Sequence, residues 1–280
     1  MKTRVITAAV LLPMFLLLVL FLPKVLTAIL FGATAALASF ELLSQTQLVK
    51  HPRMLIYSAV SAFLIGLWSY FGARREFALL GVIAFFVAMF CEMMADHIKV
   101  RFKEIGYCTI AGLILPYLLT SLVRIHTNVI GRHLILVPCV MAFVSDAGAY
   151  FAGRFFGRHK LAPVISPNKT IEGVVGGVLG ATVGMVVYAL VVDLCFKDIQ
   201  VSYVYAVIYG ILGSLGAVFG DLCFSIIKRQ TGIKDYGSLF PGHGGILDRF
   251  DSMMIVGPLA EALILLIPVA VKVWEKLSAF

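Results

Sequence analysis

Long apolar runs separated by short polar segments follow one another along almost the whole chain. A transmembrane helix needs about 20 mostly apolar residues, and nine runs approach that length. The nine predicted spans are Val5–Leu22, Val25–Leu43, Met54–Phe71, Phe77–Ala95, Ile105–Val123, Leu134–Gly153, Ile171–Val192, Tyr203–Cys223 and Ser252–Lys272. The pattern therefore predicts an all-α, polytopic integral membrane protein with about nine transmembrane helices.

The polar segments are too short to form a soluble domain, so we expect residues 1–280 to make a single membrane domain. Residues 1–123 hold the first five predicted spans. Residues 134–280 hold the remaining helices together with the two longest polar loops, 154–170 and 228–251. Most of the acidic, basic and other polar side chains that could take part in catalysis lie in this second part. We therefore predict that it is the catalytic part.

Composition supports the membrane class and excludes two others. Hydrophobic residues make up 61% of the chain and charged residues 14%, against about 25% charged residues in an average soluble domain. A soluble protein of this size could not bury so much apolar surface, and a disordered chain has the opposite composition. The five cysteines lie in or beside apolar runs without any CxxC pair, which is typical of buried apolar side chains.

The net charge of +8 indicates an orientation in the membrane rather than binding to nucleic acid. If the amino terminus is cytoplasmic, fifteen Lys and Arg residues fall on the cytoplasmic side and eight on the opposite side. Positive residues favour the cytoplasmic side of short loops. Both long polar loops, 154–170 and 228–251, are then predicted to face the cytoplasm.

Acidic residues within apolar spans are costly and need a reason. Glu41, Glu92 and Asp96 fall at the ends of predicted spans, where the membrane interface can solvate them. Asp146 is different, because it follows a long apolar run and shares a helix face with Tyr150, four residues further on. We therefore regard Asp146 as a functional candidate.

The polar segment after Asp146 leads to a second predicted helix start. Ser166 followed by Pro167 is typical of a helix amino terminus, so Lys169 and Glu172 are predicted to lie in the first turns of the helix that follows. An acidic and a basic side chain would then face the membrane surface together.

The densest polar region runs from Asp221 to Asp251. On a helix, Asp221 would share one face with Ser225, Lys228 and Arg229. Asp248 and Asp251 are three residues apart and would also share a face. Between these acids, glycines flank His243, and such a loop can bring backbone N–H groups close to an anion.

The side-chain types in this region favour one kind of chemistry. Carboxylates without neighbouring cysteines suit a hard cation such as Mg²⁺, and Mg²⁺ beside Lys and Arg suits a polyphosphate. Nucleotidyl and phosphoryl transfer depend mainly on positioning and charge neutralisation. The sequence therefore predicts a transferase that acts on a nucleotide and a phospholipid at the membrane surface.

The 27 residues from Ser225 to Asp251 resemble the signature of a known family. They read Ser225-x-x-Lys228-Arg229-x(4)-Lys234-Asp235-x-Gly237-x(3)-Pro241-x-His243-Gly244-Gly245-x-x-Asp248-Arg249-x-Asp251. This is similar to the signature of the phosphatidate cytidylyltransferases, or CDP-diacylglycerol synthases. The segment 146–173, with its Ser-Pro-x-Lys-x-x-Glu-Gly element, also resembles that family.

The resemblance implies the reaction of CTP with phosphatidic acid to give CDP-diacylglycerol and pyrophosphate. It also implies dependence on Mg²⁺, with K⁺ as the candidate for a second cation. The metal ligands implied are Asp221 and Asp248, and Asp251 and Asp146 are weaker candidates for the same centre. The predicted catalytic residues are Asp221, Asp248, Lys228 and Lys234. The predicted substrate-binding residues are Arg229, Arg249, His243, Ser166, Asn168, Lys169, Glu172 and Ser225.

The resemblance further predicts CTP, phosphatidic acid and membrane lipids as partners, in the inner membrane of a bacterial cell with the active site toward the cytoplasm. Glycine-rich helix faces fit a homodimer and a monomer equally well. A membrane transporter is the main alternative, but no inverted repeat is visible and the polar clusters lie at one predicted surface. A CDP-alcohol phosphotransferase is a second alternative, which the lack of a D-G-x-x-A-R run disfavours.

Overall fold

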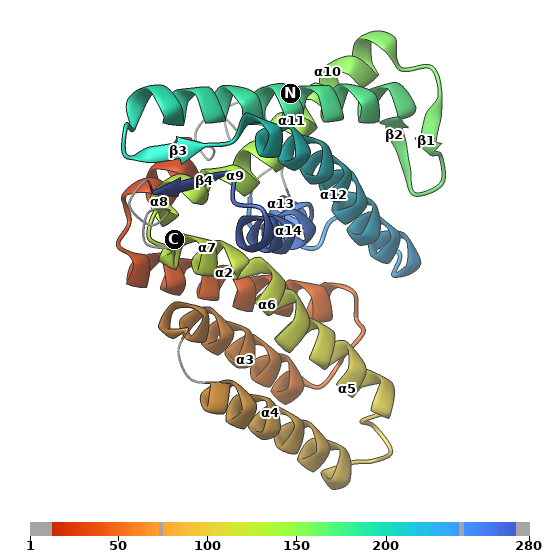
Figure 1. Ribbon diagram of the computed structural model, residues 1–280. Helices are drawn as coiled ribbons and strands as arrows, with labels where there is room; N and C mark the ends of the chain where they lie inside the picture. Colours follow the sequence, from red (N-terminus) through yellow and green to blue (C-terminus); the bar gives the residue numbers. More distant parts are fainter. Residues whose placement is uncertain (1–12, 73–74, 241–243, 273–280) are drawn as a thin grey trace. The chain divides into compact units, whose positions relative to one another are not determined.

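The computed structural model describes residues 13–72, 75–240 and 244–272, and these residues are predominantly helical (Figure 1). Seven helical segments in this part of the chain are long and apolar enough to cross a membrane, and they are Lys24–Gln45, Pro52–Phe71, Arg75–Ala95, Phe102–Thr127, Gly131–Phe156, Ile171–Cys195 and Tyr203–Gln230. The protein is therefore a polytopic helical membrane protein, as predicted.

The predicted count of nine spans is not confirmed. The first predicted span, Val5–Leu22, lies partly outside the described residues. The last, Ser252–Lys272, contains a shorter apolar helix of 14 residues, Met253–Leu266, followed by a short strand. The other seven predictions each coincide with one of the long segments.

Large apolar side chains cover the outside of the long helices as well as their packed faces. Leu79, Leu179 and Val183, for example, are all more than half exposed. Such a surface suits hydrocarbon, and a helix satisfies its backbone hydrogen bonds internally, as a bilayer requires.

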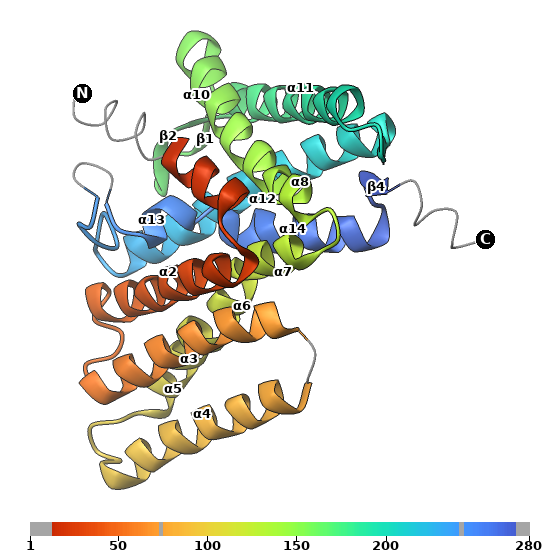
Figure 2. The same ribbon diagram turned by 90° about the vertical axis from the view of Figure 1, so that its left-hand side faces the viewer.

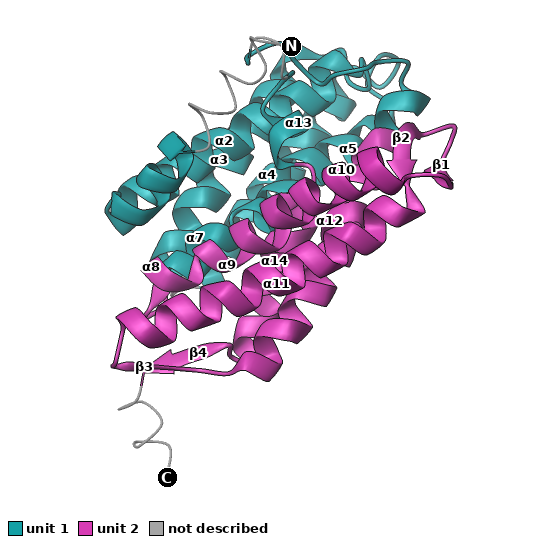
Figure 3. Ribbon diagram, turned by 90° about the horizontal axis from the view of Figure 1, so that it is seen from above, with its two compact units in different colours: residues 1–127, 227–250 teal, residues 128–226, 251–280 magenta. Residues whose placement is uncertain are grey.

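The chain forms two compact units, which Figure 3 distinguishes by colour. Unit 1 comprises residues 1–127 and 227–250, and unit 2 comprises residues 128–226 and 251–280. The predicted catalytic part, 134–280, is thus shared between the units, because 227–250 packs with the first helices. Helix α12 (Tyr203–Gln230) contributes residues to both units.

Unit 1 is a stack of helices in which α2, α3 and α4 follow one another side by side (Figure 2). Its elements besides the end of α12 are α2 (Lys24–Gln45), α3 (Pro52–Phe71), α4 (Arg75–Ala95), α5 (Phe102–Thr109), the π-helical turn η1 (Ile110–Ile114), α6 (Leu115–Leu119), α7 (Ser121–Thr127) and α13 (Leu247–Phe250). Helices α2 and α3 approach closely at Gly32 and Gly66, where a side chain on Gly66 would overlap the α2 backbone. The core includes Phe31, Leu43, Met54 and Tyr236.

Unit 2 is built around the antiparallel pair α10 and α11, with α12 and α14 packed beside them. Besides α12, its elements are α8 (Gly131–Leu134), α9 (Leu136–Cys139), the π-helical turn η2 (Val140–Val144), α10 (Ser145–Phe156), β1 (Lys160–Ala162), β2 (Ser166–Thr170), α11 (Ile171–Cys195), β3 (Ile199–Val201), α14 (Met253–Leu266) and β4 (Ala270–Lys272). Strands β1 and β2 form an antiparallel hairpin at one end of α11. Strands β3 and β4 pair antiparallel at its other end (Figure 1).

Close packing of small residues fixes α10 against α11. A Cβ on Gly148 of α10 would lie 2.5 Å from the carbonyl oxygen of Gly176 in α11. Further along, a buried hydrogen bond of 2.7 Å joins the hydroxyls of Ser145 and Ser214, beside Gly177. Small residues on both helices allow this close approach, which gives the pocket described below a rigid wall.

Candidate active site

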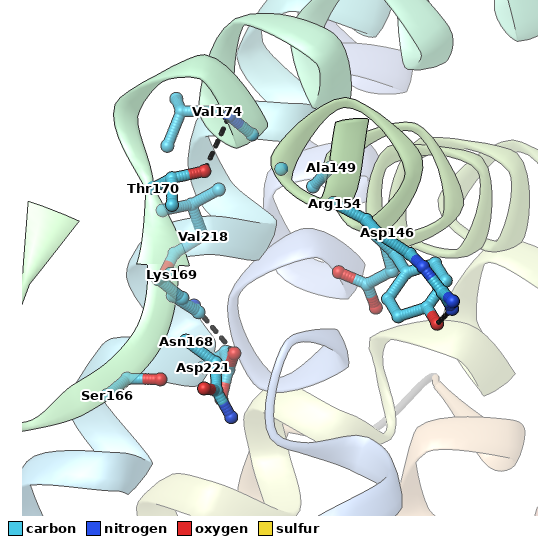
Figure 4. A pocket seen from close by; sticks show the side chains of 13 residues that line it. Asp146, Ala149, Arg154, Ser166, Asn168, Lys169, Thr170, Val174, Val218 and Asp221 are labelled. Carbon is cyan, nitrogen blue, oxygen red and sulfur yellow. Dashed lines mark hydrogen bonds and ion pairs between the residues drawn. The ribbon is translucent and has the colours of Figure 1, made fainter. Parts of the chain in front are cut away.

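A pocket of about 480 Å³ opens in unit 2, at the end that carries the β1–β2 hairpin (Figure 4). Helices α10, α11 and α12 and strand β2 form its walls. The lining residues that carry polar or charged side chains are Asp146, Tyr150, Arg154, Ser166, Asn168, Lys169, Thr170 and Asp221. Five of these were predicted as site residues from the sequence, so the fold brings together the segment 146–170 and the later residue Asp221.

Asp221 is the centre of the polar wall on α12. The Nζ atom of Lys169 lies 2.6 Å from its Oδ2 atom, and the two side chains are 21% and 34% exposed, respectively. The hydroxyl of Ser225, one turn later, donates to Oδ1 at 3.3 Å. Figure 4 shows Lys169 reaching Asp221 from strand β2. This pair joins residues 52 positions apart, which only the folding of the hairpin against α12 can bring together.

The opposite wall of the pocket is one face of α10. Asp146, Tyr150 and Arg154 recur every four residues and all line the cavity. An Nη1 atom of Arg154 donates to the hydroxyl of Tyr150 at 2.8 Å. The wall begins directly after the π-helical turn η2, and such turns shift the register of the residues that follow. Asp146 thereby faces the same cavity as Asp221.

The structure corrects the predicted helix start at Ser166. Residues Ser166–Thr170 form strand β2, and helix α11 begins at Ile171. Thr170 has an extended backbone and its hydroxyl accepts a hydrogen bond from Gly173 N at 3.1 Å, so it is the true N-cap. The prediction missed this because Ser-Pro is as compatible with an edge strand as with a helix start. Lys169 is therefore placed by a strand, while Glu172 does lie in the first helical turn.

Glu172 holds the base of the hairpin. Its carboxylate accepts hydrogen bonds from the backbone N–H groups of Arg158 and His159 and lies 2.6 Å from Nδ1 of His159. Lys160 Nζ closes the hairpin further by donating to the carbonyl of Pro167 at 2.6 Å. Glu172 does not line the pocket. Its contacts stabilise the hairpin that carries Ser166, Asn168 and Lys169.

A second polar cluster lies in unit 1 around Asp248. Lys228 Nζ lies 2.8 Å from Asp248 Oδ1, and the side chains are only 12% and 3% exposed. The other carboxylate oxygen accepts hydrogen bonds from the backbone N–H groups of Tyr236 at 2.7 Å and Gly245 at 3.0 Å. Burial of a carboxylate requires such partners, and Asp248 has them on both oxygens.

The glycine-flanked loop before Asp248 does not present its amides as expected. The N–H groups of Ile246 and Leu247 donate to the carboxylate of Glu41 on α2, and that of Gly245 donates to Asp248. These three amides are therefore engaged by protein carboxylates instead of facing an anion from solution. His243 lies outside the described residues.

The chain is similar to known proteins along nearly its whole length. Residues 2–267 match the profile of the cytidylyltransferase family. The chain belongs to this family. The phosphatidate cytidylyltransferase of Bacillus subtilis (strain 168) is 34% identical over 266 residues, which cover 92% of this chain and 95% of the relative. Those of Staphylococcus haemolyticus and Staphylococcus aureus (strain COL) are 34% and 32% identical over 95% of this chain and 99% of each relative.

Family membership confirms the resemblance read from the signature, and it favours an enzyme over a transporter. Arg229, Lys234 and Arg249 are exposed. Asp251 belongs to unit 2, and its carbonyl oxygen would lie 2.9 Å from a Cβ on Gly220, the residue before Asp221.

Sequence reasoning did not select three residues that the structure of this cytidylyltransferase-family protein brings to the polar clusters. Tyr150 and Arg154 line the pocket in unit 2. The sequence showed Tyr150 on the helix face of Asp146, and the same four-residue spacing extends to Arg154. Glu41 reaches the loop before Asp248 across more than 200 residues of sequence. Nothing in the local sequence around Glu41 indicates that contact.

The oxygen atoms that line the pocket are the kind of ligand that a hard cation prefers. Asp146 and Asp221 supply carboxylates from two helices, and Ser166 and Asn168 supply neutral oxygens from the hairpin. Mg²⁺ is commonly held by one or two carboxylates together with waters and substrate phosphates. Within the described part of the chain, no group of three or more His, Cys, Asp or Glu side chains gathers around one point. A site completed by substrate phosphates does not require such a group.

Proposed function

We propose that this protein is a phosphatidate cytidylyltransferase, which converts CTP and phosphatidate into CDP-diacylglycerol and pyrophosphate. The observation that carries the proposal is the family match over nearly the whole chain, together with a pocket that holds two carboxylates, a lysine and an arginine in a membrane protein. A nucleotide triphosphate and an anionic lipid both need cationic partners of this kind.

In the proposed reaction, an oxygen of the phosphatidate phosphate attacks the α-phosphorus of CTP. A new P–O–P bond forms, the bond between the α-phosphorus and its bridging oxygen to the β-phosphate breaks, and pyrophosphate leaves with that electron pair. A phosphate monoester has a second pKa near 6 and is largely ionised at neutral pH. The protein therefore needs to position and neutralise the reactants more than it needs to remove a proton.

Lys169 is the residue best placed to bind the triphosphate. Its ammonium group lies at the pocket wall, where it pairs with Asp221, and exchange of this partner for a phosphate oxygen needs only a rotation of its side chain. Asn168 and Ser166 on the same strand can donate further hydrogen bonds. An ammonium near the leaving phosphates stabilises the charge that develops on them.

Arg154 supports a site for the lipid phosphate on the facing wall. The guanidinium group can bind two phosphate oxygens at once, and Tyr150 orients it through its hydroxyl. Phe151 and Phe155, on the same end of α10, are more than half exposed and stack on each other. Tyr150 is itself more than half exposed, and exposed tyrosines are typical of the membrane interface, where a lipid headgroup would lie.

Asp221 and Asp146 are the residues that we propose to hold Mg²⁺ in this pocket. The cation, when bound, would neutralise phosphate charge and polarise the α-phosphate. Asp248 and Asp251 as further ligands, and K⁺ as a second cation, stay predictions. In unit 1, a cation at Asp248 would compete with Lys228 for Oδ1, while Oδ2 already accepts two backbone amides.

The same proposal includes a location. We expect the protein in the cytoplasmic membrane of a bacterial cell, with the pocket toward the cytoplasm, because fifteen of its Lys and Arg residues fall on that side in the predicted topology. The contact of Lys169 with Asp221 supports the part of this topology that concerns unit 2, because it requires the start of α11 and the later half of α12 to lie at one end. Dimerisation stays a prediction.

The direct test is an assay of the purified protein in lipid nanodiscs with labelled CTP and phosphatidate. We expect labelled CDP-diacylglycerol and an equal amount of pyrophosphate, and phosphatidylglycerol in place of phosphatidate should give neither. Asp221→Asn should lower turnover at least a hundredfold. The matched control is Asp193→Asn, because Asp193 lies at the opposite end of α11 and contacts Tyr203. Absence of product from folded wild-type protein would refute the proposal.

A further inference from the structure

Two carboxylates hold the loop of the family signature from both sides. We define the signature loop as residues 236–240 and 244–247. Asp248 accepts the backbone N–H groups of Tyr236 and Gly245. Glu41, near the carboxyl end of α2, accepts those of Ile246 at 3.1 Å and Leu247 at 2.9 Å. Four amides of one loop are thus bound by two side chains.

Two glycines in the loop leave the space that the Glu41 side chain occupies. A Cβ on Gly237 would lie 2.6 Å from Oε1 of Glu41, and a Cβ on Gly245 would overlap the same carboxylate. Real Cβ atoms do not approach other atoms so closely, so only glycine fits at either position without movement of Glu41. Two glycines and two amides therefore surround one carboxylate.

Glu41 has no local reason to be acidic. It lies near the carboxyl end of α2, where the helix dipole disfavours negative charge, and it belongs to an apolar span, where a carboxylate is costly. The sequence suggested that the membrane interface solvates it. In the structure, both of its carboxylate oxygens accept hydrogen bonds from the signature loop. These hydrogen bonds explain why an acidic residue stands at this position.

We infer that Glu41 is a positioning residue, which fixes the signature loop and thereby the Lys228–Asp248 pair that the family signature predicts to be catalytic. The inference rests on the proposed function for its effect on turnover, but not for its effect on the loop. A hydrogen bond to a charged group contributes more than one between neutral groups. If the hydrogen bonds from Ile246 and Leu247 to Glu41 are lost, the loop should become more mobile, because the hydrogen bonds to Asp248 alone do not hold it in place.

The first test measures the loop directly, by hydrogen exchange and mass spectrometry on the full-length protein in nanodiscs. Glu41→Gln keeps the size of the side chain but leaves one good acceptor oxygen. We expect at least one of the amides of Ile246 and Leu247 to exchange about tenfold faster in Glu41→Gln than in the wild type, because only one acceptor oxygen remains. The matched control is Glu92→Gln, since Glu92 lies in the same unit and contacts Tyr57 and Arg53 instead. Unchanged exchange in Glu41→Gln would overturn the inference.

The second test asks whether the loop matters for turnover. In Glu41→Gln, kcat should fall at least tenfold while the KM for CTP changes less than threefold and the thermal midpoint stays near that of Glu92→Gln. A variant that loses activity only in proportion to lost folded protein would indicate a structural role and overturn the positioning role. Faster exchange with normal kcat would overturn it as well.

A double-mutant cycle provides the sharpest check, because it does not depend on one variant folding well. Gly245→Ala should lower kcat in the wild-type background, where the new Cβ meets Glu41. In the Glu41→Ala background, Gly245→Ala should lower kcat by a clearly smaller factor, because the overlap with the Glu41 carboxylate is gone. Equal costs in both backgrounds would contradict the contact. If the wild type makes no CDP-diacylglycerol, the proposed function fails, and the exchange experiment still decides the role of Glu41 in the loop.

Discussion

At the scale of single residues, the pair Lys169–Asp221 decides what the pocket can bind. Both side chains are partly buried, and the ammonium lies 2.6 Å from a carboxylate oxygen. Removal of one member of such a pair leaves the other with an uncompensated charge. The positive charge of the ammonium would also repel a cation bound to the same carboxylate. Lys169 and a metal ion should therefore compete for Asp221 until a phosphate draws the lysine away.

Lys169→Ala should separate metal binding from nucleotide binding. Without CTP, we expect the variant to bind Mn²⁺ severalfold more tightly than the wild type, because the competing ammonium is gone, as measured by electron paramagnetic resonance. Its kcat/KM for CTP should fall at least a hundredfold. Lys160→Ala is the control, since Lys160 lies on the same hairpin and contacts Pro167 O. Weaker Mn²⁺ binding in Lys169→Ala would contradict the competition.

Arg154→Gln tests the lipid side of the pocket. The variant loses the guanidinium that Tyr150 orients, so we expect the KM for phosphatidate to rise at least tenfold and the KM for CTP to change less than twofold. Steady-state assays in mixed micelles, at varied mole fraction of phosphatidate, measure both. Arg158→Gln, at an exposed site just beyond the end of α10, should leave both values near normal. A rise in the KM for CTP alone would place the nucleotide at Arg154 instead.

At the scale of elements, the junction between β2 and α11 sets the position of Lys169. Thr170 ends the strand and caps the helix through its hydroxyl, and it is 6% exposed. Glu172 fastens the other side of the hairpin to the helix start. The hairpin is therefore fixed to α11 at both of its strands, and Lys169 moves only as far as its own side chain allows.

Thr170→Ala should destabilise this junction by about 1 kcal/mol, which is the usual effect of removing an N-cap hydroxyl. We expect the midpoint of unfolding in SDS to fall and Thr170→Ser to restore most of the loss, because serine keeps the capping oxygen. A midpoint unchanged in Thr170→Ala would show that the cap contributes nothing measurable there.

The packing of α10 on α11 allows a similarly direct comparison between two glycines. Gly148→Ala places a Cβ 2.5 Å from the Gly176 carbonyl, whereas Gly81→Ala on α4 meets nothing within 4 Å. Overpacking of this kind costs roughly 1–3 kcal/mol. We expect a lower thermal midpoint and reduced turnover for Gly148→Ala, and wild-type behaviour for Gly81→Ala. Equal midpoints for the two variants would argue against a rigid pocket wall.

At the scale of the whole molecule, the distribution of basic residues predicts the orientation in the membrane. Cysteine labelling can measure it in spheroplasts that express a variant without native cysteines. Asp235→Cys should react with an impermeant maleimide only after lysis, because residue 235 lies in the predicted cytoplasmic loop. Lys197→Cys, between α11 and β3, should react in intact spheroplasts. The reverse result would invert the topology and move the pocket to the outer face.

Much of the architecture was predictable because one physical requirement dominates it. A bilayer admits only helices of about 20 apolar residues, so seven long helical segments could be read directly from hydropathy. The two acids of the pocket, Asp146 and Asp221, were also visible, because acids within apolar runs are rare. The helix start at Ser166 was not, because Ser-Pro fits a strand equally well and the true cap, Thr170, lies four residues later.

By itself, the sequence determined the membrane class, the course of the long helices and which side chains share a helix face, since a periodicity of 3.6 residues relates near neighbours only. Asp146, Tyr150 and Arg154 could therefore be grouped on α10. Only the tertiary structure decided that Lys169 meets Asp221, and that Glu41 binds amides 205 and 206 residues away. Such contacts depend on how elements pack, and packing follows from the fit of many surfaces at once rather than from any local pattern of residues.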